Sequence, residues 1–82
     1  GQNYPNPLNP VTTIQFELPE QIHVTLTIYD VQGREIDVLI NKVQSPGSHK
    51  IQWDARKVAS GIYFYSLETT NHQITRKMIL LR

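Results

Sequence analysis

Apolar and polar residues alternate with a period of two along most of the chain after residue 10. Because successive side chains of a strand point to opposite faces of a sheet, each such run indicates a strand with one buried side. The runs are rich in Thr, Val, Ile and Tyr, which suit a pleated surface. No segment has the apolar spacing of an amphipathic helix. The predicted strands cover residues 12–18, 22–30, 34–40, 49–53, 61–68 and 72–81.

Turn-forming residues separate these runs. Asp30 and Gly33 fit the outer positions of a type I turn, and Pro46 with Gly47 fits a type II turn. Asn71 is expected in a left-handed conformation within a hairpin turn. Short strands with turn signals at this spacing predict an all-β fold, a small antiparallel sandwich of six or seven strands.

The core is expected on the apolar side of each strand. Trp53 is the only tryptophan and is interpreted as a core anchor, with sugar stacking as the alternative. The predicted core residues are Phe16, Val24, Leu26, Ile28, Val38, Ile51, Trp53 and Phe64.

Composition narrows the possible functions. The chain has 82 residues, enough for one domain, with 39% apolar and 18% charged residues, as in a folded domain. Its net charge of +1 does not indicate binding to nucleic acid. There is no cysteine, which excludes disulfides and thiolate metal sites. No apolar run is long enough to span a bilayer, so direct membrane insertion is not expected.

Catalytic and metal-binding patterns are missing from the sequence. His23, His49 and His72 lie in three separate segments without ligand spacing. Ser60 is followed by Gly61 but lacks the flanking glycines of a nucleophile elbow. We therefore expect no enzymatic activity, no metal and no cofactor.

The first ten residues differ from the rest. Three of the five prolines lie there, and proline biases its surroundings toward extended backbone. Residues 1–10 are predicted to be a proline-rich linker or lead-in, and residues 11–82 the folded domain. The lead-in either spaces a preceding domain from the sandwich or packs down as its edge.

Several stretches together resemble a known family. They are NYPNPLNPVTTIQFELP, VTLTIYDVQGREI, PGSHKIQWDARKVASGIYFYSLE and TRKMILLR, which span residues 3–82. They look like the type A C-terminal sorting domain of the type IX secretion system. Leu8 stands where that family often has Phe, and Ala55 where it often has Gly.

The resemblance implies an immunoglobulin-like sandwich at the end of a larger exported protein. Such a protein reaches the periplasm through an N-terminal signal peptide, and the outer-membrane secretion machinery then recognises the folded domain. A sortase-like surface peptidase commonly removes it. The attached cargo is linked to an anionic lipopolysaccharide at the cell surface or released outside the cell.

The resemblance also implies that the sorting signal lies in the last two strands. The residues it singles out are Gly61, Tyr63, Tyr65, Lys77, Met78, Ile79, Leu80, Leu81 and Arg82. Four consecutive apolar residues, 78–81, break the alternation, so either Met78 with Leu80 or Ile79 with Leu81 must face away from the core. That outer pair is either covered by the chain itself or available to a partner, by surface docking or by strand addition.

Two other classes of protein fit the strand pattern. One is a structural module similar to the immunoglobulin-like domain of the flagellar hook-capping protein. The other is an accessory carbohydrate-binding module of a secreted enzyme, with Tyr29, Tyr63 and Tyr65 as the candidate aromatic platform. Cross-strand packing is the alternative role for these tyrosines.

Overall fold

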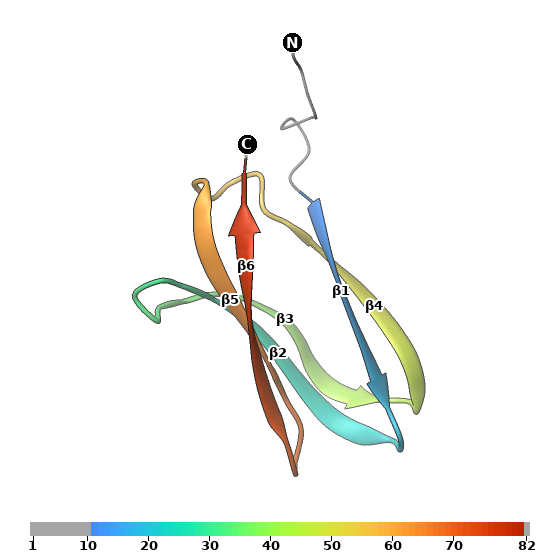
Figure 1. Cartoon of the computed structure of the whole chain (residues 1–82). Coiled ribbons are helices and arrows are strands. Elements are labelled where there is room, and N and C mark those ends of the chain that lie inside the picture. Colours follow the sequence, from blue (N-terminus) through green and yellow to red (C-terminus); the bar gives the residue numbers. More distant parts are fainter. Residues whose placement is uncertain (1–10, 82) are drawn as a thin grey trace.

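The computed structural model describes residues 11–81 and folds them into six antiparallel strands (Figure 1). No helix occurs within this range. The six strands confirm the predicted small all-β sandwich. The strands are β1 (Val11–Leu18), β2 (Ile22–Asp30), β3 (Glu35–Gln44), β4 (Gly47–Asp54), β5 (Gly61–Glu68) and β6 (Gln73–Leu80).

The strands form two sheets. β1 pairs with β4, and the larger sheet has the order β3-β2-β5-β6. The chain therefore changes sheet after β1, β3 and β4, while β2–β3 and β5–β6 are hairpins within the larger sheet. This arrangement is consistent with an immunoglobulin-like sandwich. The start of β1 and the end of β6 lie at the same end of the molecule (Figure 1).

The core lies between the two sheets. Trp53 of β4 is 3% exposed and meets Tyr63 of β5 edge to face, with ring centroids 5.6 Å apart. The Tyr63 hydroxyl donates a hydrogen bond to the Ala59 carbonyl oxygen at 2.6 Å. The buried apolar residues are Ile14, Phe16, Leu18, Val24, Leu26, Ile28, Ile40, Trp53, Ala55, Tyr63 and Leu80.

Two predicted core residues are wrong. Val38 is 42% exposed because the β2–β3 ladder shifts register between Leu26 and Thr27, and such a bulge changes which side chains face the core. Phe64 lies on the outer face of β5, while Tyr63 is its buried neighbour. Ile51 is only half-buried, although it packs against the core. The other five predicted core residues are buried: Phe16, Val24, Leu26, Ile28 and Trp53.

The predicted turns also differ in detail. The Gly33 amide donates to the Asp30 carbonyl at 3.0 Å, which closes the expected turn, and Gly47 has the expected positive φ of 110°. The left-handed conformation predicted for Asn71 is wrong, since no residue other than glycine has positive φ in residues 11–81. Instead, the Thr69 hydroxyl accepts from the His72 amide at 3.2 Å and closes this turn with ordinary backbone angles.

Candidate functional site

The two segments singled out in the sequence lie side by side in the fold. β5 and β6 pair antiparallel at the edge of the larger sheet, in one unbroken register. Gly61 faces Leu80, and Ile62 faces Ile79. The two segments that carry the predicted signal therefore belong to a single hairpin.

Several residues of the predicted set belong to the core. Tyr63 and Leu80 are 7% and 8% exposed, and Tyr65 and Met78 pack against the core from half-buried positions. Tyr63 and Leu80 therefore offer little surface to a partner, and Tyr65 and Met78 offer only part of theirs. Gly61 begins β5 with a φ of 149°, a conformation that residues with side chains rarely adopt. Its role is therefore to allow this backbone conformation at the start of β5, since it has no side chain to offer a partner.

The outward members of the set lie in β6 and directly after its end. Ile79 is 65% exposed and Leu81 is 75% exposed, so this is the pair that faces away from the core. Lys77 is exposed on the same face as Ile79. Arg82 lies outside the described residues.

The sequence interpretation missed the neighbours of these residues on the outer face. Ile62 is 40% exposed opposite Ile79, and half-buried Phe64 lies opposite Lys77. Tyr29 of β2 is opposite Phe64 on its other side. The outer patch is defined here as Tyr29, Ile62, Phe64, Lys77 and Ile79. The alternation within residues 61–68 places Ile62 and Phe64 on one face, and it is the signal that could have found them.

Charge on β6 is positive and concentrated at its middle. Arg76 and Lys77 are consecutive, exposed and on opposite faces. Within residues 11–81 the ion pairs are Asp30 with Arg34 and Asp54 with Arg56, so neither β6 cation has a carboxylate partner there. The hairpin thus offers an apolar outer face beside two uncompensated positive charges.

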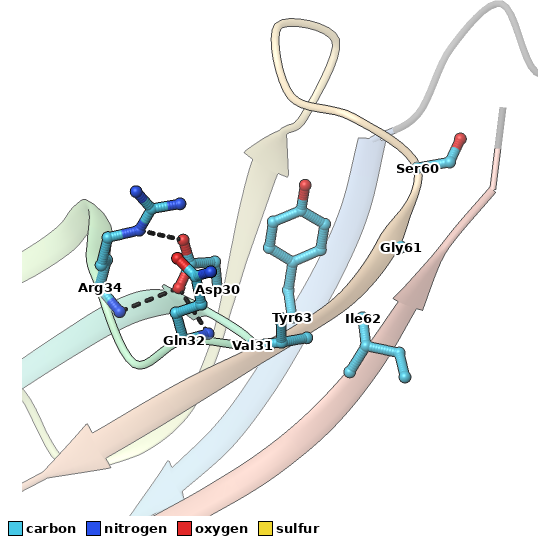
Figure 2. A pocket seen from close by; sticks show the side chains of 8 residues that line it. All are labelled: Asp30, Val31, Gln32, Arg34, Ser60, Gly61, Ile62 and Tyr63. Atoms are coloured by element: carbon cyan, nitrogen blue, oxygen red, sulfur yellow. Dashed lines mark hydrogen bonds and ion pairs between the residues drawn. The ribbon is translucent and has the colours of Figure 1, made fainter.

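A hollow of about 490 Å³ lies beside the patch, between the β2–β3 turn and the start of β5 (Figure 2). One wall is the turn, where the Asp30 carboxylate accepts from the Arg34 amide at 2.9 Å and from Arg34 Nε at 2.8 Å. These bonds, the amide bond first, lower the pKa of Asp30. Asp30 is therefore a turn-forming carboxylate, already satisfied by donors, and is poorly suited to accept a proton in catalysis.

The histidines give no metal centre. No group of three or more His, Asp or Glu residues within the described range could hold an ion. His49 stacks on Phe16 with centroids 5.1 Å apart, and its Nε2 lies 2.8 Å from the Ser45 carbonyl oxygen. The described residues also contain no helix long and apolar enough to cross a membrane.

The aromatic platform expected for carbohydrate binding is wrong. Tyr63 and Tyr65 face the core rather than solvent. Tyr29 lies on the outer face with Phe64 instead, on neighbouring strands. Two half-buried rings of this kind are typical of cross-strand packing.

The chain was compared with known proteins. A family model described as a secretion system C-terminal sorting domain matches residues 2–81, which is nearly the whole chain. No curated protein matches, and no solved structure matches.

Proposed function

The chain belongs to the family of C-terminal sorting domains of the type IX secretion system, and we propose that the outer patch, extended by Leu81, is the surface that the secretion machinery recognises. Domains of this family are sorting signals, which send an attached cargo protein to the cell surface or the extracellular space. They act through the type IX machinery and are joined to an upstream cargo.

One observation carries the proposal. The β5–β6 pairing sets Ile62 beside Ile79 on the face turned away from the core, and both side chains are exposed. Exposed branched apolar side chains grouped on one face are typical of a docking surface. Lys77 supplies a charge at its margin. A partner that covers this patch gains apolar burial at little cost to the fold.

The residues singled out in the sequence then divide by role. Lys77, Ile79 and Leu81 would touch the machinery, and Arg82 remains an expected contact. The inward members support these residues from the core side: Gly61, Tyr63, Tyr65, Met78 and Leu80. A deletion of residues 77–82 would remove both kinds at once, because Leu80 is buried. Point substitutions are therefore the sharper test.

The experiment uses the chain fused behind a folded reporter that carries a periplasmic signal peptide, expressed in a bacterium with type IX secretion. Ile79→Ser should strongly reduce surface display while the melting temperature of the 82-residue chain stays within a few degrees. The matched control is Val43→Ser on β3, which removes an apolar side chain that is 55% exposed away from the patch. Equal display of both variants would contradict the proposal.

The proposed role as a sorting signal also implies that the domain is removed after export. A sortase-like surface peptidase would remove the domain, with residues 1–10 as the linker between the cargo and the folded residues 11–82. The prolines of residues 1–10 favour the extended backbone that suits a spacer. Mass spectrometry of the displayed cargo checks this, since a cargo that retains residues 11–82 would contradict removal.

The chain itself is proposed to have no enzymatic activity. Its family consists of secretion signal domains. The Asp30 carboxylate beside the hollow already accepts hydrogen bonds from Arg34 within the turn. Activity of the exported protein would then belong to the cargo. A hydrolysis screen with the 82-residue chain alone should give background rates.

A further inference from the structure

β6 is an open edge of the larger sheet. It pairs with β5, and no other strand of residues 11–81 pairs with it. An edge strand presents backbone N–H and C=O groups that can bind a further strand. β6 contains neither proline nor glycine, and all eight of its residues pair with β5 in regular register.

The opposite edge of the same sheet is less suited to an added strand. β3 shifts register twice against β2, and such bulges twist an edge away from new partners. β1 and β4 are regular, but the inward side chains of β1 are already buried: Ile14, Phe16 and Leu18. β6 differs because Ile74 on its inner face and Ile79 on its outer face are 44% and 65% exposed. An added strand would cover apolar surface on both faces.

The charges of β6 disfavour a second copy of the chain as that strand. A symmetric antiparallel pair must place one residue opposite itself. Two registers pair the greatest number of β6 residues between the two copies. In one of them Arg76 lies opposite Arg76 of the other copy, and in the second Lys77 lies opposite Lys77 of the other copy. Each therefore sets two like charges directly opposite one another, which is destabilising.

We propose that β6 is extended by a strand of a partner protein that carries acidic side chains opposite Arg76 and Lys77. The two cations point to opposite faces, so the partner strand needs a carboxylate on each face. This rests on the proposed function, because the partner meant is a component of the secretion machinery. The recognition then uses the backbone edge of β6 together with the outer patch, rather than the patch alone.

Binding of synthetic peptides to the 82-residue chain tests directly whether β6 accepts an added strand. The probe is a capped eight-residue peptide of alternating Thr and Val with two adjacent central Glu residues. It should bind the 82-residue chain and slow hydrogen exchange of the β6 amides. A peptide with two central Lys residues should bind about ten-fold more weakly, because attraction becomes repulsion at two positions. A peptide with alternate backbone nitrogens methylated keeps its side chains and should not bind.

Charge reversal supplies the second arm. Arg76→Glu with Lys77→Glu should invert the preference, so that the Lys peptide binds more tightly than the Glu peptide. It should also reduce surface display of the reporter fusion while the melting temperature changes by only a few degrees. Binding of the methylated peptide, or equal binding of the two charged peptides, would overturn strand addition. If display still falls for Ile79→Ser under that outcome, the proposed function stands and only this mode of recognition fails.

Discussion

Leu80 and Ile79 are consecutive residues of β6 that face opposite sides of the sheet, and replacing each with Ala should have very different effects on stability. Leu80 is 8% exposed and belongs to the core, while Ile79 is 65% exposed. Truncating a buried Leu costs about 2–5 kcal/mol, and the lower part of that range applies at a strand end where neighbours can relax. Truncating Ile79 should cost about 1 kcal/mol or less, mostly through strand propensity.

These free energies convert into a measurable difference. In a domain of this size each kcal/mol shifts the melting temperature by about 4–8 °C. Leu80→Ala should therefore lower it by about 10–20 °C, and Ile79→Ala by a few degrees. Thermal unfolding followed by far-UV circular dichroism and by Trp53 fluorescence measures both changes, and agreement of the two probes checks two-state behaviour. Equal losses for the two variants would refute the assignment of inner and outer faces on β6.

Three further predictions concern the rest of the domain. Tyr63→Phe removes the hydrogen bond to Ala59 but keeps the ring against Trp53, so the melting temperature should fall by about 5 °C, from a loss of about 1 kcal/mol; an unchanged value would mean that the bond contributes nothing. The pKa of Asp30 is lowered in the folded state chiefly by the hydrogen bond from the Arg34 amide, and the pKa of Asp54 chiefly by the hydrogen bond from the Arg56 side chain. Both carboxylates therefore stabilise the folded state above the unfolded pKa of about 4, and this stabilisation is lost as the pH falls through the folded pKa values. A melting temperature that rises between pH 5 and pH 3 would contradict that sign. EDTA should leave the melting temperature unchanged, and a shift of several degrees would reveal a metal site.

The alternation of residues was enough to predict the six strands, and five of the eight residues predicted for the core are buried. It failed where the fold depends on register. A bulge in β3 is not visible in a run such as 34–40, so Val38 was assigned to the wrong side. In β5 both faces carry large apolar residues, Ile62 with Phe64 and Tyr63 with Tyr65, and alternation alone cannot tell which face is buried.

The same ambiguity limited the prediction of the site. Sequence reasoning required that one pair among residues 78–81 face outward, but it left both pairs open. The choice depends on the β5–β6 register, which sets Leu80 opposite Gly61 and Met78 opposite the buried Tyr63. The turn at Asn71 failed for a related reason, since a neighbouring hydroxyl, that of Thr69, replaced the expected backbone conformation.

The alternation of inner and outer residues on β6 assigns stability and the proposed recognition to different side chains, since Leu80 is buried and Ile79 is exposed. Under the proposed function, stability and recognition can therefore be separated by point substitution. If the domain is stable by about 5 kcal/mol, a loss of about 3 kcal/mol leaves it about 97% folded at 25 °C. Leu80→Ala should therefore export cargo nearly as well as the intact chain despite its low melting temperature. Ile79→Ser should export poorly despite a nearly normal one. Export that followed melting temperature across the two variants would show that the machinery reads the folded state alone, without contact to the outer patch.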